Sequence, residues 1–247
     1  MTTARRVAIT ATVMFASSMY ALDWTIAAVA LPHMQGTFSA TQDQISWVLT
    51  SYIVISAIAM PTTAWLAERL GRKKLYLIAI SGFTFFSVLC GGADSLETEI
   101  AYRLAQGAFG AFLIPLSQSI LLDTYPPAQH AKAMAIWSVG IMLAPVIGPT
   151  VGGYLTHEYS WRWVFFINIP MGLLGILGGV IFLAKMPRSQ AARGFDWLGF
   201  FALAIGVGAL QTMLDRGERL DWFQSGEVII ESTLVVAGLY IFVVQGL

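Results

Sequence analysis

The chain has 247 residues, of which 57% are hydrophobic and only 11% are charged, and its formal net charge is zero. An ordinary soluble domain carries about 25% charged residues, so this composition excludes an ordinary soluble domain. The lack of net positive charge gives no reason to expect a nucleic-acid partner. The single cysteine, Cys90, excludes an internal disulfide, and three widely spaced histidines argue against a metal-dependent membrane enzyme.

Eight apolar segments are long enough to cross a membrane as helices, for which about 20 apolar residues are needed. In chain order they lie at 8–31, 45–66, 75–93, 99–122, 131–155, 163–184, 197–214 and 228–247. Charged or turn residues bound the segments, and the connections are short, for example DSLET at 94–98. The sequence therefore predicts an all-α, polytopic membrane protein.

Lysine and arginine placement predicts the orientation, because cytoplasmic loops carry an excess of both residues. With the N-terminus in the cytoplasm, ten of these residues fall on the cytoplasmic side, three fall on the outer side and Arg103 lies within a span. The ten are Arg5, Arg6, Arg69, Arg72, Lys73, Lys74, Lys132, Lys185, Arg188 and Arg193. The three are Arg162, Arg216 and Arg219. Both chain ends are expected to face the cytoplasm.

The first segment can also be read as a signal peptide, since two arginines precede an apolar run with an A-x-A pattern at 28–30. The run is too long for that, and Asp23 interrupts it, so an uncleaved span is expected. A carboxyl group inside a membrane is costly and is a functional candidate. Burial favours its protonated form, and an approaching cation favours proton loss. Asp23 can therefore exchange a proton for a cation, unless it serves only as a structural hydrogen-bond acceptor.

The loop between the second and third segments is rich in charge. Gly71 permits a tight turn, and its charged neighbours are Glu68, Arg69, Arg72 and Lys73. These charges can bind helix ends and latch one conformation. They also satisfy the simpler role of a cytoplasmic anchor.

The fourth segment contains Arg103, with Gln106 about one turn further along the same face. Arginine keeps its charge, so inside a membrane it needs a partner or water. We expect Arg103 and Asp23 to interact, directly or through water. The competing expectation is that Arg103 reaches the outer headgroups.

The fifth segment contains the stretch GIMLAPVIGPTVGGY at 140–154. Small residues recur every four positions on one face, at Gly140, Ala144, Gly148 and Gly152. The adjacent face carries Pro145, Pro149 and Gly153. Small residues allow close packing of membrane helices, and prolines bend them. The stretch predicts a kinked, closely packed span at an interface that either moves or is static.

Aromatic and methionine side chains can line an apolar cavity that accepts organic cations. The candidates are Tyr20, Trp24, Tyr52, Phe109, Phe112, Trp137 and Met142. Lipid contact or helix packing is the alternative for each of them.

Several of these stretches, in chain order, resemble motifs of one family. GPTVGG at 148–153 resembles the antiporter motif of the major facilitator superfamily. AWLAERLGRKK at 64–74 and RLAQGAFGA at 103–111 resemble its loop and fourth-span motifs. Three others look like the EmrB/QacA type of drug:proton antiporter, which has about fourteen spans: LDWTIAAVALP at 22–32, WRWVFFINIPMG at 161–172 and MLDRGERLDWF at 213–223.

The resemblance implies a six-helix bundle at 1–187, a cytoplasmic linker at 188–194 and two extra central helices at 195–247. It also implies that a second six-helix half is absent, and the lack of a charged flank after the last span agrees with a truncated chain. Proton coupling would then involve Asp23, Arg103 and Gln106. The loop motif departs from the family pattern at Ala64 and Glu68, which puts a geometry-dependent latch in doubt.

The resemblance implies proton-coupled multidrug efflux across the bacterial inner membrane, with no cofactor. Its partners would be the lipid bilayer, protons, hydrophobic or cationic small molecules and, where present, an EmrA-like periplasmic adaptor with an outer-membrane channel. No GxxxxGK[ST] loop occurs, which argues against an ATP-driven pump. The alternatives are a transporter of a defined metabolite, a non-transporting truncated membrane protein and, with least support, a membrane enzyme.

Overall fold

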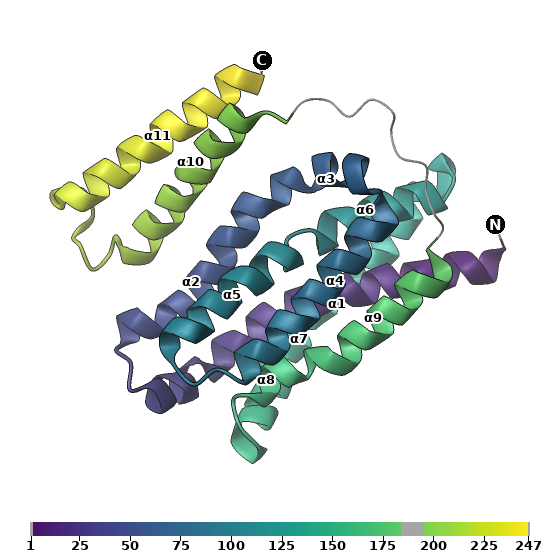
Figure 1. Cartoon of the computed structure of the whole chain (residues 1–247), viewed down its shortest axis with the longest axis horizontal. Coiled ribbons are helices and arrows are strands. Elements are labelled where there is room, and N and C mark those ends of the chain that lie inside the picture. Colours follow the sequence, from purple (N-terminus) through teal and green to yellow (C-terminus); the bar gives the residue numbers. More distant parts are fainter. Residues whose placement is uncertain (1, 184–194, 247) are drawn as a thin grey trace.

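The protein is all-helical throughout residues 2–183 and 195–246, which are the residues that this computed structural model describes (Figure 1). Eight helical segments are long and apolar enough to cross a membrane, which confirms the eight predicted segments. Their bounds are Thr3–Phe38, Gln42–Leu70, Arg72–Gly91, Leu96–Thr124, Pro127–Glu158, Trp163–Phe182, Trp197–Arg216 and Gly226–Gln245. The predicted linker at 188–194 lies outside the described residues, so the domain boundaries stay a prediction.

The first five segments contain α1 (Thr3–Phe38), α2 (Gln42–Ala59), η1 (Met60–Thr62), α3 (Thr63–Leu70), α4 (Arg72–Gly91), α5 (Leu96–Gly110), α6 (Leu113–Thr124), η2 (Pro127–Gln129) and α7 (His130–Glu158). The last three contain α8 (Trp163–Phe166), α9 (Asn168–Phe182), α10 (Trp197–Arg216), η3 (Trp222–Gln224) and α11 (Gly226–Gly246). Successive segments run in alternating directions. We call the end that carries Gly71 the Gly71 end, and the opposite end, which carries Ser95, the Ser95 end.

Three predicted spans are each interrupted near a proline. Pro61 lies in η1 between α2 and α3, Pro115 follows the break between α5 and α6, and Pro170 follows the break between α8 and α9. Proline has no N–H group to donate to the carbonyl four residues earlier, and its ring crowds that carbonyl. For Pro170 that carbonyl belongs to Phe166, the last residue of α8. Proline alone does not decide the outcome, because α1 continues through Pro32.

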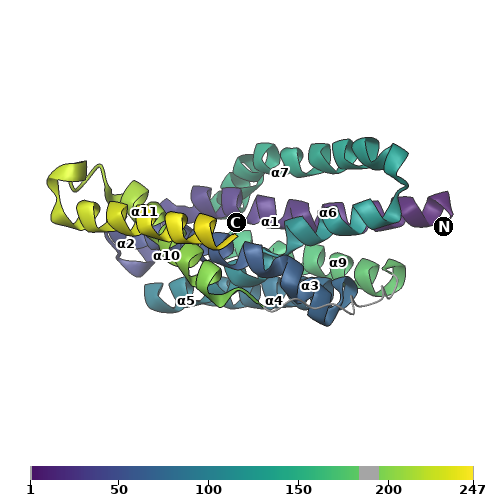
Figure 2. The ribbon, with the colours of Figure 1, turned by 90° about the horizontal axis from the view of Figure 1, so that it is seen from above.

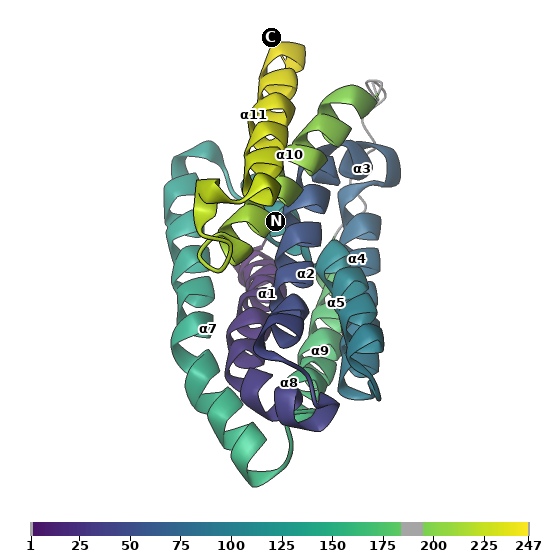
Figure 3. The ribbon, with the colours of Figure 1, turned by 90° about the vertical axis from the view of Figure 1, so that its left-hand side faces the viewer.

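The central helix is α1, which contacts α2, α6, α7, α8 and α9 (Figures 2 and 3). It continues to Phe38, beyond the end predicted at residue 31. Asp23 therefore lies 15 residues before the end of α1, a distance of roughly 22 Å along the helix axis. The carboxyl group is deeper in the bundle than the sequence pattern indicated.

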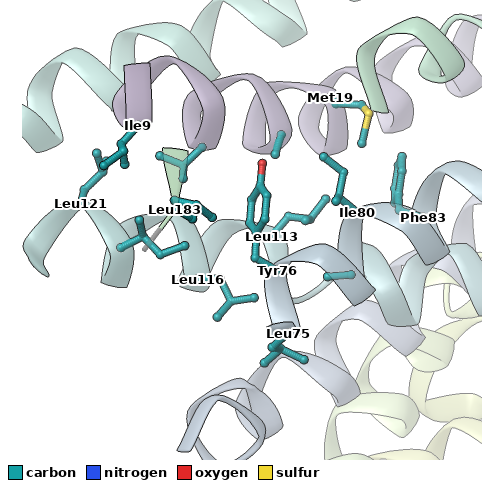
Figure 4. Close-up of a cluster of buried hydrophobic side chains, with 14 of the residues drawn as sticks. Ile9, Met19, Leu75, Tyr76, Ile80, Phe83, Leu113, Leu116, Leu121 and Leu183 are labelled. Carbon is teal, nitrogen blue, oxygen red and sulfur yellow. The ribbon is translucent and has the colours of Figure 1, made fainter. Parts of the chain in front are cut away.

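Two apolar clusters hold the bundle together. The cluster toward the Gly71 end is shown in Figure 4 and includes Ile9, Met19, Tyr76, Phe83 and Leu116. The second cluster includes Leu22, Ile26, Met34, Val48 and Phe165. Asp23 directly follows Leu22 of the second cluster, and Met19 of the first cluster lies one turn earlier on α1. The buried carboxyl group therefore lies where the two apolar clusters meet.

The last two helices form a hairpin at the side of the bundle (Figure 1), where α10 contacts α2. Thr50 Oγ1 of α2 donates to Asp215 Oδ2 of α10 at 3.1 Å. Asp43 of α2 forms an ion pair with Arg219, which follows α10. Polar contacts therefore join the hairpin to α2 near the Ser95 end.

Candidate functional site

A buried ion pair joins α1 to α5. Arg103 Nη1 donates to Asp23 Oδ2 at 2.5 Å, and both side chains are 0% exposed. The structure thus brings together the two charged residues that the sequence analysis expected to interact. Arg103 does not reach the bundle surface, which contradicts the competing expectation of contact with headgroups.

The second oxygen of the Asp23 carboxylate accepts two amide hydrogen bonds. Gln106 Nε2 donates to Asp23 Oδ1 at 3.0 Å, and Asn168 Nδ2 donates to the same atom at 2.7 Å. Asn168 Nδ2 also donates to Ser87 Oγ at 2.9 Å. The carboxylate is therefore held by α1, α5, α9 and, through Ser87, α4.

Sequence reasoning missed Asn168 and Ser87. Asn168 belongs to the stretch WRWVFFINIPMG, where it is a polar residue inside an apolar run. A neutral amide carries no charge that requires a partner, so its role depended on knowing its position in space. Its isolation in that run is the one signal that could have found it.

The guanidinium group of Arg103 is fixed on several sides. Nε donates to the backbone carbonyl of Val48 in α2 at 3.2 Å, and Nη1 also donates to Gln106 Oε1 at 2.8 Å. The carbon atom of the guanidinium group lies 4.0 Å from the centre of the Tyr52 ring. Such a cation–π contact stabilises a desolvated arginine. The third nitrogen, Nη2, has no hydrogen-bond partner among the described residues.

An apolar cavity of about 680 Å³ lies between α1, α2 and α7. Its lining residues are Tyr20, Ala21, Trp24, Tyr52, Ile53, Ser56, Ala57, Met60, Pro61 and Pro145. Tyr20 and Trp24 were predicted as cavity residues because they flank Asp23 in the sequence. Tyr52 lines the cavity and also packs on Arg103, so one aromatic ring contacts both the cavity and the ion pair.

The other four cavity candidates, Phe109, Phe112, Trp137 and Met142, lie elsewhere. Phe109 stacks on Phe86 with ring centres 5.7 Å apart, and Trp137 is buried and donates to Ser17 Oγ at 3.3 Å. Met142 is 70% exposed on α7. None of them lines the cavity described above. Aromatic and methionine side chains also serve packing between helices, so residue type alone could not separate the two roles.

The ladder of small residues on α7 packs on α1. Gly140 lies against Met14, Gly148 against Thr25 and Gly152 against Ile26, and Ala144 is buried. A Cβ atom at Gly152 would lie 3.2 Å from Ile26 Cα, so the two backbones approach closely.

The adjacent face of α7 is less covered. Pro149 is exposed, Gly153 has open space beside it, and Pro145 lines the cavity. The helix runs unbroken from His130 to Glu158 through both prolines. Movement at this interface stays a prediction.

The charged loop binds the ends of neighbouring helices. Lys73 Nζ donates to the carbonyls of Val180 and Leu183 at 2.7 Å each, at the end of α9. Arg72 forms an ion pair with Asp123 near the end of α6. Cations at helix C-termini stabilise the exposed carbonyl groups.

The remaining two charged residues of this motif lie beside Trp65. The guanidinium group of Arg69 lies 4.4 Å from the Trp65 ring centre. Glu68 lines a second cavity, together with Trp65 and Phe195. A latch to an opposite half of a transporter stays a prediction.

Gly71 connects α3 to α4 with φ +84° and ψ 140°. Only glycine adopts this region without strain, so the substitution Gly71→Ala should lower the free energy of unfolding by about 1–3 kcal/mol. Thermal unfolding of the purified full-length protein measures this effect. Gly208→Ala is the control, because Gly208 is helical and has open space beside it. Equal unfolding temperatures for the two variants would contradict the assigned strain.

The amino-acid sequence of this chain matches a known protein family and several characterised relatives. The sequence pattern described as Major Facilitator Superfamily matches residues 13–246. The chain is 42% identical over 241 residues to the multidrug export protein EmrB of Escherichia coli (strain K12), covering 98% of this chain and 47% of that protein. It is 41% identical over 226 residues to the fatty acid resistance protein FarB of Neisseria gonorrhoeae, covering 92% of this chain and 45% of that protein.

A solved structure shares the same fold. The inward-facing, unoccupied crystal structure of a bacterial homolog to the human lysosomal transporter Spinster superposes with a TM-score of 0.62 at 19% sequence identity. That match covers 98% of this chain and 61% of the other. The chain spans about half the length of the two sequence relatives. It is a multi-pass membrane protein and belongs to the Major Facilitator Superfamily.

Proposed function

We propose that this chain forms part of a proton-driven exporter of hydrophobic and cationic compounds. The observation that carries the proposal is the buried Asp23–Arg103 ion pair, which lies beside an apolar cavity and shares Tyr52 with it. The similarity to a multidrug export protein supports the substrate class. In this proposal the proton gradient supplies the free energy, and no nucleotide or metal takes part.

The ion pair can couple proton binding to substrate binding. A proton on Asp23 removes its negative charge and weakens its hold on Arg103. Tyr52 packs on Arg103 and lines the cavity, so a shift of the guanidinium group alters the cavity wall. A cation that enters the cavity favours the ionised form of Asp23. Proton and cation therefore bind in competition, which is the requirement for antiport.

The proposed setting is the bacterial inner membrane, with the Gly71 end in the cytoplasm. The excess of lysine and arginine at the Gly71 end supports this orientation. An EmrA-like periplasmic adaptor and an outer-membrane channel are the proposed partners at the Ser95 end, by analogy with the similarity to EmrB.

A transporter of one defined polar metabolite is the second candidate. Such a substrate is normally fixed by charged or convergent polar groups. The lining of the cavity carries no formally charged side chain, and its polar groups are two tyrosine hydroxyls, one serine hydroxyl and the Trp24 indole N–H. This composition favours amphipathic compounds of varied shape over a single polar metabolite.

Reconstitution of the full-length protein into liposomes tests the proposal. An imposed pH gradient should drive movement of a fluorescent organic cation against its concentration gradient, and a protonophore should stop it. Structurally unrelated cations should compete for transport. Transport that ignores the pH gradient, or that accepts a single metabolite, would contradict the proposed function.

The substitution Trp24→Leu should weaken binding of an aromatic cation. Trp24 lines the cavity and is 43% exposed. Loss of one cation–π contact should raise the Kd about two- to tenfold, measured by fluorescence titration of the purified full-length protein. The matched control is Trp222→Leu, because Trp222 is 41% exposed but lies in η3, away from the cavity. Equal Kd changes in both variants would exclude Trp24 from the binding site.

A further inference from the structure

A second buried carboxyl group lies one helical turn from Arg103. The side chain of Glu99 is 0% exposed, and within residues 2–183 and 195–246 neither of its carboxylate oxygens has a hydrogen-bond partner. Glu99 precedes Arg103 by four residues on α5, so both side chains lie on one face of the helix. This glutamate is not used by the proposed coupling between Asp23 and the cavity.

The charged and titratable groups near Glu99 come from several elements. Arg103 on α5, Asp23 on α1 and Arg162 next to α8 all interact with it electrostatically, as does Cys90 on α4. Arg162 is hydrogen-bonded elsewhere, because its Nη1 donates to the carbonyls of Gly91 and Ala93 at 2.9 and 2.7 Å. The other cation that acts on Glu99 among the described residues is Arg103.

Arg103 has one donor group free for a second carboxylate. Nη1 binds Asp23 and Nε binds a backbone carbonyl, but the buried Nη2 has no partner in the part of the chain that the structure describes. A glutamate four residues before an arginine is within reach of its guanidinium group on a helix. The two unpartnered groups, Glu99 and Arg103 Nη2, therefore complement each other in charge and in spacing along α5.

The absence of a partner determines the protonation state of Glu99 in this conformation. An ionised carboxylate without a hydrogen bond or counter-charge is far more costly to bury than a neutral carboxylic acid. The positive charge of Arg103 is already balanced by Asp23. Arg162 acts on Glu99 from a distance, but among the described residues no group donates a hydrogen bond to either Glu99 oxygen, so burial favours the neutral acid here.

We propose that Glu99 is a second proton-carrying residue, which passes its proton to Asp23 and takes over Arg103 as its ion-pair partner. This inference rests on the proposed antiport function. In the exchange, the O–H bond of the Glu99 carboxylic acid breaks and an O–H bond forms on Asp23. Arg103 leaves the neutral Asp23 and pairs with the ionised Glu99 through Nη2. One proton moves, and the total charge of the three residues does not change.

The position of Glu99 gives the exchange a direction. Glu99 lies in the first turns of α5, which begins at Leu96 at the Ser95 end, whereas Asp23 lies near the middle of α1. A proton that enters from the Ser95 end therefore meets Glu99 first and reaches Asp23 second. Asp23 then releases the proton toward the Gly71 end when a substrate enters the cavity.

The test compares Glu99→Gln with Glu97→Gln in the full-length transporter. Glutamine matches the size of a neutral glutamic acid but carries no exchangeable carboxyl proton, and Glu97 is an exposed glutamate on the same helix. In proteoliposomes, Glu99→Gln should lower pH-gradient-driven transport by about tenfold or more. It should leave exchange of labelled for unlabelled substrate, which needs no net proton movement, near the rate of the wild type. Glu97→Gln should match the wild type in both assays.

Infrared difference spectra give a readout that a purely structural role would not produce. The carboxylic-acid C=O stretch of the resting protein should lose intensity in Glu99→Gln and not in Glu97→Gln. The conservative variant Glu99→Asp, which keeps a titratable group, should restore part of the proton-driven transport.

Three results would overturn the inference. These are proton-driven transport at the wild-type rate by Glu99→Gln, an unchanged carboxylic-acid band in that variant, and a large fall in the unfolding temperature of that variant. The last result would contradict the inference because glutamine replaces a neutral side chain of equal size. Failure of the proposed function looks different. In that case the wild type itself does not respond to a pH gradient, whereas a working wild type with a fully active Glu99→Gln variant excludes only the role of Glu99.

Discussion

The substitution Asp23→Asn is expected to lower pH-gradient-driven transport by about 100-fold, the scale on which a positioned proton-transfer group contributes. Asparagine can still accept hydrogen bonds from Gln106 and Asn168, so the local packing is kept. Asparagine cannot bind and release a proton, so the pH gradient can no longer drive transport through this position. Drug-gradient-driven exchange of substrate, which moves no proton, should persist.

Transport of a fluorescent cation into proteoliposomes, with and without a pH gradient, measures this effect. Asp94→Asn is the control, because the Asp94 side chain is 99% exposed and lies 3.9 Å from its nearest cation, Arg162. It should transport at the wild-type rate. Asp23→Glu keeps the titratable group and should retain more of the coupling than Asp23→Asn.

The substitution Arg103→Met is expected to lower the free energy of unfolding by about 3–5 kcal/mol, because it leaves the buried Asp23 carboxylate without its counter-charge. Arg103→Lys should lie between the wild type and Arg103→Met, because lysine keeps the charge but cannot reproduce the planar contacts to Val48, Gln106 and Tyr52.

Unfolding of the purified full-length protein, monitored by circular dichroism, measures this loss. The surface pair between Arg219 and Asp43 provides the control, since both side chains are partly exposed. Arg219→Met should change the free energy of unfolding by about 0–1 kcal/mol. An equal loss in the free energy of unfolding in both variants would show that the buried ion pair of Arg103 stabilises the protein no more than the surface pair does.

Asp23→Asn should be less destabilising than Arg103→Met, although each breaks the same ion pair. In Asp23→Asn the guanidinium group can still pair with Glu99, which lies one turn away and accepts no hydrogen bond from any described residue. In Arg103→Met the buried Asp23 carboxylate loses the cation with which it is paired. The double variant Asp23→Asn with Glu99→Gln should lose more stability than the sum of its parts, because the two carboxylates substitute for each other.

The number and approximate place of the membrane helices followed from apolar length, because lipid leaves a chain little choice other than helices or closed barrels. The pairing of Asp23 with Arg103 followed from the cost of leaving either charge alone in a membrane. The breaks near Pro115 and Pro170 did not follow, since α1 and α7 continue through their own prolines. Whether a proline interrupts a helix depends on what neighbouring groups do for the freed carbonyl.

The parts of the site that sequence reasoning missed are neutral or depend on packing. Asn168 and Ser87 carry no charge, so nothing in the sequence required them to meet Asp23. Of the aromatic residues predicted to line a cavity, Tyr20, Trp24 and Tyr52 do so, whereas Phe109 and Trp137 pack between helices. Glu99 is the first residue of the predicted span at 99–122, and its burial, which the sequence does not show, distinguishes it.

Proton movement driven by a substrate gradient tests the central claim most directly, because it needs no imposed pH gradient and reads the coupling in reverse. Full-length protein is reconstituted with a pH-sensitive dye inside the liposomes, and a cationic substrate is added outside. The account predicts that the wild type and Asp94→Asn change the internal pH as substrate enters, and that Asp23→Asn carries substrate without any pH change. A pH change of wild-type size in Asp23→Asn would contradict the assignment of the buried carboxyl group as the site of proton exchange.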